Sequence, residues 1–259
     1  MTALDAWARG CGVIRHSDQT RERIGALAAR LVETGAASSE DLVYEALSAA
    51  DRLASAAMWV VVHMTYARRV DLSGADLMAA DFKPAPEGHT GGSLNVVPAY
   101  VGYLAANLLT AKTRGWILGQ GHCVAAVEAV NCLVGNLSDR QVSRYGFSEE
   151  GISRLCTDFY GYGIDADGSP SAPLGSHVNA YTAGGVSEGG YLGFAETQYV
   201  HMPLAGESLV AILSDGAFEE QRGGDWAERW WRAEDCGLVA LSRNGCSNAV
   251  LTRASCALS

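Results

Sequence analysis

Three histidines set among glycines are the residues of this sequence best suited to chemistry. His89 and His122 each follow a glycine, and His177 follows Gly175-Ser176. Glycine lets the main chain pass close to a ligand, and imidazole is a hydrogen-bond donor that changes protonation state near neutral pH. This pattern favours a polyphosphate or sugar-phosphate ligand.

An acidic turn, Ser214-Asp215-Gly216, follows the apolar run 208–213. Asp215 has two interpretations: it caps the start of a helix, or it is a magnesium ligand that acts with a diphosphate oxygen and an amide oxygen. Asn244 lies 29 residues further along, directly after another short apolar run, and could supply the amide oxygen. An acidic turn followed at about this distance by asparagine is the pattern by which thiamine diphosphate enzymes bind magnesium and diphosphate.

Strands that alternate with helices are expected to position these residues. Helices are predicted over 21–32, from Ser38 or Ser39 to 68, and over 93–109. Further helices are predicted from the residues after His122 to about 134, over 189–202 and within 216–235. The strands are predicted over 116–118, 208–213 and 238–241. The alternation predicts an α/β fold with a doubly wound, mostly parallel sheet and helices on both faces. His122 and Asp215 both follow predicted strands, where such folds bind ligands.

Two parts of the chain are expected on this basis. Residues 1–70 form a helical N-terminal extension, and residues 71–259 form the α/β domain. The net charge of −10 argues against a nucleic-acid partner and an anionic membrane surface. Seven scattered cysteines, without metal-binding spacing, fit reduced thiols, mostly buried, of a cytoplasmic protein. The remaining histidines, His16, His63 and His201, lack glycine-rich surroundings and are expected to be structural.

Four short motifs, three of them with glycine, and the acidic turn occur in the order seen in phosphoketolases. They are Gly88-His89-Thr90-Gly91-Gly92-Ser93-Leu94-Asn95, Gly121-His122, Ser176-His177-Val178, Glu188-Gly189-Gly190-Tyr191-Leu192-Gly193 and Asp215-Gly216. From about residue 82 to residue 216, the sequence resembles the N-terminal, diphosphate-binding half of a phosphoketolase, within the transketolase superfamily of thiamine diphosphate enzymes.

The resemblance implies a role for each motif. The catalytic residues would be His89, His122 and His177, which would line the channel that holds the thiazolium carbon and the phosphosugar and would transfer protons or bind substrate hydroxyls. The cofactor-binding residues would be Gly121, Glu188, Gly189, Gly190, Asp215 and Gly216. Magnesium would be held by Asp215, Asn244 and the backbone carbonyl of Cys246. The cofactor would supply the carbanion chemistry.

The function expected from this resemblance is carbon–carbon bond cleavage of ketose phosphates, an aldehyde-lyase reaction that needs thiamine diphosphate and magnesium. The chain ends 15 residues after Asn244, so we expect an α/β domain that is incomplete at its C-terminus. It would be a truncated or frame-shifted product, or one half of a split enzyme. Turnover would then need a homo-oligomer, or a partner chain with a pyrimidine-binding domain.

Other functions remain open at this point. A sugar-phosphate epimerase or a two-carbon transferase could use the same histidines. A truncated, non-catalytic remnant would keep only the fold. A metal-dependent hydrolase using the three histidines and Asp215 is a further alternative, although their spacing matches no common metal motif.

Overall fold

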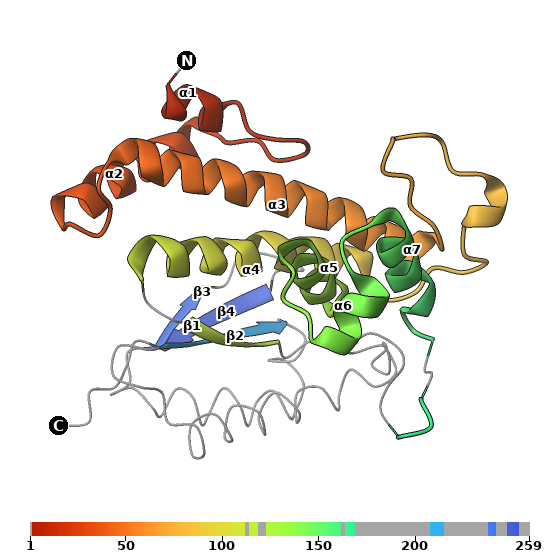
Figure 1. Cartoon of the computed structure of the whole chain (residues 1–259). Coiled ribbons are helices and arrows are strands. Elements are labelled where there is room, and N and C mark those ends of the chain that lie inside the picture. Colours follow the sequence, from red (N-terminus) through yellow and green to blue (C-terminus); the bar gives the residue numbers. More distant parts are fainter. Residues whose placement is uncertain are drawn as a thin grey trace.

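The computed structural model describes residues 2–111, 114–118, 123–161, 164–168, 208–214, 238–241 and 248–253. These residues form a set of helices above a four-stranded sheet (Figure 1). The helices are α1 (Ala3–Ala8), α2 (Asp18–Glu33), α3 (Glu40–Tyr66), α4 (Thr90–Thr110), α5 (Ala125–Val134), α6 (Asp139–Tyr145) and α7 (Glu149–Asp158), with a short 3-10 turn, η1 (Ala79–Asp81). The strands are β1 (Arg114–Leu118), β2 (Ser208–Ser214), β3 (Leu238–Leu241) and β4 (Asn248–Arg253).

Serine residues occupy the N-cap positions of four of these helices. The hydroxyl oxygens of Ser17, Ser39, Ser138 and Ser148 each accept a hydrogen bond from the backbone N–H three residues further along. Such a bond satisfies one of the amide groups that have no partner inside the helix. The predicted helix from Ser38 or Ser39 is confirmed as α3, and the predicted strand over 208–213 is confirmed as β2.

The main core lies where α3, α4, α5 and α7 meet. Val60, Val61 and Met64 of α3 pack in one buried cluster with Val96 and Val97 of α4. Most side chains of α5 are buried, and small ones such as Ala125, Ala126 and Ala129 let this helix pack closely against α3 and α4. In Figure 1, α4 lies between α3 and the sheet.

A second buried cluster fixes the N-terminal helices. It contains Trp7, Ala28, Ala37, Val43 and Tyr44, and it joins α1 and α2 to the first half of α3. The boundary between 1–70 and 71–259 stays a prediction.

The doubly wound, mostly parallel sheet predicted from the sequence is wrong. The described residues are mainly helical, and the strand order of their sheet is β1-β2-β4-β3. Only β1 and β2 run parallel, whereas β4 is antiparallel to both β2 and β3. Six residues separate β3 from β4, and a parallel return needs a crossover of about a dozen residues or more. The connection is therefore too short for a parallel pair.

The sequence predicted helices on both faces of the sheet. The helices that the structure describes, α3, α4 and α5 among them, lie on one side of it (Figure 1). The predicted helices over 189–202 and within 216–235 lie outside the described residues. The four cysteines in the described ranges are free, and three of them are buried, as expected. Within the same ranges, no helix is both long and apolar enough to cross a membrane.

Candidate functional site

His89 occupies the N-cap position of α4. Its ring nitrogen Nδ1 accepts a hydrogen bond of 2.8 Å from the Gly92 N–H, and its carbonyl accepts one of 3.0 Å from the Ser93 N–H. A neutral imidazole that accepts at Nδ1 carries its proton on Nε2. The side chain of His89 is exposed.

The first turn of α4 packs against Cys123, the residue that follows His122 in the sequence. A Cβ atom at Gly92 would overlap the Cys123 sulfur and lie 2.7 Å from His89 Nδ1. A larger residue at this position would therefore force the Cys123 or His89 side chain to move. Cys123 is 1% exposed, and burial raises the pKa of its thiol to about 12, while the nearby Ser93 hydroxyl acts in the opposite direction. A thiol with this pKa packs the site and is no nucleophile at neutral pH.

Gly88 brings the chain into His89 past a buried aromatic ring. Its φ is +78°, which favours glycine, and a Cβ atom there would lie 3.0 Å from Phe159 Cε1. Phe159 is 1% exposed and directly follows α7. The positive φ of Gly88 and the nearby Phe159 ring together restrict the backbone conformation between Glu87 and His89.

The segment that leads to His89 also caps the end of α3. The last four carbonyls of a helix have no partner inside it. Here each has a donor: the His63, Met64, Thr65 and Tyr66 carbonyls accept from Ala67 N–H (2.8 Å), Lys83 Nζ (2.7 Å), Glu87 N–H (3.0 Å) and Lys83 N–H (2.8 Å), in that order. Beyond this cap, Thr90 Oγ1 donates to the Tyr66 hydroxyl at 3.3 Å. The end of α3 and the start of α4 are thus one connected structure.

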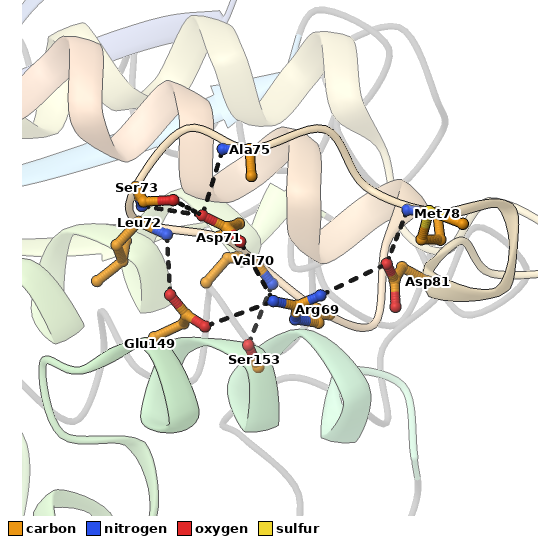
Figure 2. Close-up of polar contacts among 10 residues, drawn as sticks. All are labelled: Arg69, Val70, Asp71, Leu72, Ser73, Ala75, Met78, Asp81, Glu149 and Ser153. Atoms are coloured by element: carbon orange, nitrogen blue, oxygen red, sulfur yellow. Dashed lines mark hydrogen bonds and ion pairs between the residues drawn. The ribbon is translucent and has the colours of Figure 1, made fainter.

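Earlier in the connection between α3 and α4, polar contacts around Arg69 join the chain to α7, as Figure 2 shows. Arg69 lies 3.2 Å from an Asp71 oxygen, 3.8 Å from an Asp81 oxygen and 3.7 Å from a Glu149 oxygen. The Val70 N–H also donates to Ser153 Oγ at 3.1 Å. The pKa of the Asp71 carboxyl is lowered, mainly by the hydrogen bond that the Ser73 hydroxyl donates to it.

Two strand ends lead into the other predicted site residues. β1 and β2 are parallel neighbours with Leu118 opposite Ile212, so their C-terminal ends lie at the same edge of the sheet. The Gly119–His122 motif follows β1 in the sequence, and Asp215 follows β2. In α/β proteins, ligands bind beyond such strand ends.

His89 is the one predicted site residue that lies among the described residues. The others, namely Gly121, His122, His177, Glu188, Gly189, Gly190, Asp215, Gly216, Asn244 and Cys246, lie outside them. Whether they come together stays a prediction. In the described part of the chain, no three His, Cys, Asp or Glu side chains are grouped so that they could hold a metal ion.

The two other histidines within the described ranges contact neighbouring side chains or backbone. His16 Nε2 lies 2.7 Å from an Asp51 oxygen, and its ring stacks on Trp7. His63 Nδ1 lies 2.8 Å from the Trp59 carbonyl oxygen. Their structural role stays a prediction, and His201 lies outside the described residues.

Comparison with known proteins gives a family for the chain. Residues 41–233 match the model of the XFP N-terminal domain, which is the N-terminal domain of phosphoketolases. No curated protein and no solved structure gives a significant match to the chain. The match includes His89, His122, His177 and Asp215, and it covers well over half of the sequence. The chain therefore belongs to the family of phosphoketolase N-terminal domains.

Proposed function

We propose that this chain is the diphosphate-binding half of a thiamine diphosphate- and magnesium-dependent enzyme that cleaves a carbon–carbon bond in ketose phosphates. One observation carries the proposal: the family match encloses all three histidine motifs and Asp215 in phosphoketolase order. Phosphoketolases are lyases that generally depend on thiamine diphosphate.

The parallel pair β1 and β2 supports a ligand site at their C-terminal edge. Two separate parts of the sequence, 119–122 and 215–216, continue from neighbouring strand ends. The diphosphate and its magnesium ion would be held there by Gly121, Asp215 and Gly216 with Glu188, Gly189 and Gly190, and the metal would also bind Asn244 and the Cys246 carbonyl.

Among the described residues, His89 is suited to binding the substrate. Its N-cap bond orients the ring and keeps the proton on Nε2, so the ring can donate a hydrogen bond to a substrate oxygen. Because the Gly92 N–H occupies Nδ1, proton transfer at His89 would also pass through Nε2. When bound, thiamine diphosphate supplies the carbanion chemistry, while the histidines orient the substrate and hold or move protons.

The active site would be completed by a pyrimidine-binding domain on a second copy or on a partner chain. Such a domain provides the glutamate that ionises the aminopyrimidine of the cofactor in enzymes of this superfamily. The experiment therefore supplies that domain separately, as a purified C-terminal part of a phosphoketolase. It mixes this domain with this chain, magnesium, thiamine diphosphate and inorganic phosphate, which accepts the two-carbon fragment released by cleavage.

Product masses from a panel of ketose phosphates decide between the possible reactions. Cleavage shortens the sugar, epimerisation leaves its mass unchanged, and two-carbon transfer lengthens an added acceptor sugar. We expect cleavage, with a loss of about a hundredfold or more in His89→Gln because a positioned proton-transfer or hydrogen-bonding group contributes about this much. His63→Gln, which changes a histidine in the last turn of α3, is the matched control. Cofactor binding without any turnover would instead favour a non-catalytic remnant.

A further inference from the structure

We propose that Lys83 is a positioning residue that holds His89 in place for its role in the site. The inference rests on the proposed function, because that function gives His89 its role. It starts from an unusual observation: the side chain of Lys83 is 3% exposed, although lysine is almost never fully buried unless it is paired.

The buried ammonium group has three kinds of partner, each from a different segment. It donates to the Met64 carbonyl at 2.7 Å and forms an ion pair with Glu87. It also lies 5.7 Å from the centre of the Phe159 ring, within the range of a cation–π contact. Lys83 therefore joins the end of α3, the loop before α4 and the residue after α7.

The position of Lys83 at the end of α3 explains why a cation is buried there. The C-terminal end of a helix carries a partial negative charge, and lysine can bind its last carbonyls. Lys83 covers two of the four end carbonyls of α3, one with its ammonium group and one with its backbone N–H. Glu87 covers a third with its own N–H.

The link from Lys83 to His89 is short and runs along two routes. Glu87, the carboxylate partner of Lys83, is separated from His89 only by Gly88. Gly88 is confined by Phe159, whose ring also lies beneath the Lys83 ammonium group. Loss of Lys83 would release the carboxylate on one side and loosen the ring on the other, so the backbone at Gly88 would no longer be held.

The predicted consequence is a change at the His89 ring. The N-cap bond requires Nδ1 to face the Gly92 N–H. When the loop moves, this bond breaks part of the time, the ring populates both neutral tautomers, and hydrogen exchange of the Gly92 amide becomes roughly fivefold faster, as loss of an ordinary cap implies.

The experiment compares Lys83→Met with Arg69→Met in the full chain, using histidine labelled with ¹³C and ¹⁵N. Methionine keeps most of the length of the side chain and removes the charge. Arg69 is a matched control, because it is the other cation that anchors the same connection but lies 46% exposed at its opposite end. The His89 signals are identified by their loss in His89→Gln.

We expect the ¹⁵N shifts of wild type and of Arg69→Met to show the Nε2–H tautomer alone, and those of Lys83→Met to show a mixture. A folded Lys83→Met protein with the wild-type His89 spectrum would overturn the proposal. If Lys83→Met does not fold, Glu87→Gln decides in the same way, because it keeps the side-chain size and the bond to Thr65. The measurement needs no cofactor, so it can fail or succeed independently of thiamine diphosphate binding.

Discussion

The substitution Gly92→Ala tests how tightly the candidate site is packed. The added methyl group would overlap the Cys123 sulfur and lie 2.7 Å from His89 Nδ1. Cys123 is 1% exposed and has little room to move. We expect the exposed His89 ring to swing away, so that the Gly92 N–H loses its acceptor.

The magnitude follows from two costs and one gain. Overpacking of a buried site costs about 1–3 kcal/mol, and loss of an N-cap bond costs about 1 kcal/mol. Alanine in place of glycine in a helix returns up to about 1 kcal/mol. The free energy of unfolding of Gly92→Ala should therefore fall by about 1–3 kcal/mol.

A second glycine of α4 provides the matched control. A Cβ atom at Gly102 would meet nothing within 4 Å, so Gly102→Ala should raise the free energy of unfolding by about 0.5–1 kcal/mol. Two identical substitutions in one helix should thus have opposite effects. Cys123→Ala makes room for the methyl group, and we expect it to restore about 1 kcal/mol in the double variant relative to the sum of the single ones.

Urea unfolding followed by circular dichroism measures all four variants. The packing argument fails if Gly92→Ala is as stable as Gly102→Ala. It also fails if Gly92→Ala and Cys123→Ala show no coupling, because the two residues would then not be in contact.

Two further predictions concern charges and thiols. Arg69→Met should lower the free energy of unfolding by at most about 1 kcal/mol at low salt and by almost nothing in 1 M salt, since the ion pairs of Arg69 are partly exposed and screened; an unchanged effect at high salt would contradict this. Cys11 should react with an alkylating reagent at pH 8 before Cys123 or Cys156, because burial raises the pKa of both to about 12. For the same reason the folded chain keeps thiol protons that the unfolded chain releases, so the free energy of unfolding should fall as the pH rises from about 9 towards 12; mass spectrometry and unfolding at several pH values check both statements.

Helices could be predicted well from the sequence because their signals are local. Ser39 followed by Glu40 and Asp41 marks the start of α3, and the structure shows the Ser39 hydroxyl bound to the Leu42 N–H. The prediction for α4 was less accurate, because the sequence placed its start at Ser93, whereas the helix begins at Thr90. Histidine is not a common N-cap residue, so the role of His89 as a cap was not visible.

The direction of the strands could not be obtained from local signals. Alternation of strands and helices predicted parallel pairing, which holds for β1 and β2 only. β4 was not predicted at all, although Val250 and Thr252 are β-branched residues that strands favour. The six-residue connection from β3 was the available sign of an antiparallel return.

The surroundings of His89 depend on contacts between distant segments. Nothing local in the sequence marks Lys83 as buried, because its burial arises only where the chain folds back on the end of α3. The contact between Gly92 and Cys123 likewise joins two motifs that the sequence separates by thirty residues. The glycine-rich motifs pointed to a ligand, while the packing around the motif at His89 came from the structure.

The most direct test of the central claim is calorimetric titration of the purified chain with thiamine diphosphate, with and without magnesium. Asp215→Ala removes the proposed metal ligand, and Asp76→Ala, a change at an exposed aspartate, is its control. The account predicts magnesium-dependent binding in the wild type and in Asp76→Ala and none in Asp215→Ala. Absence of binding in the wild type, or equal binding in Asp215→Ala, would contradict it.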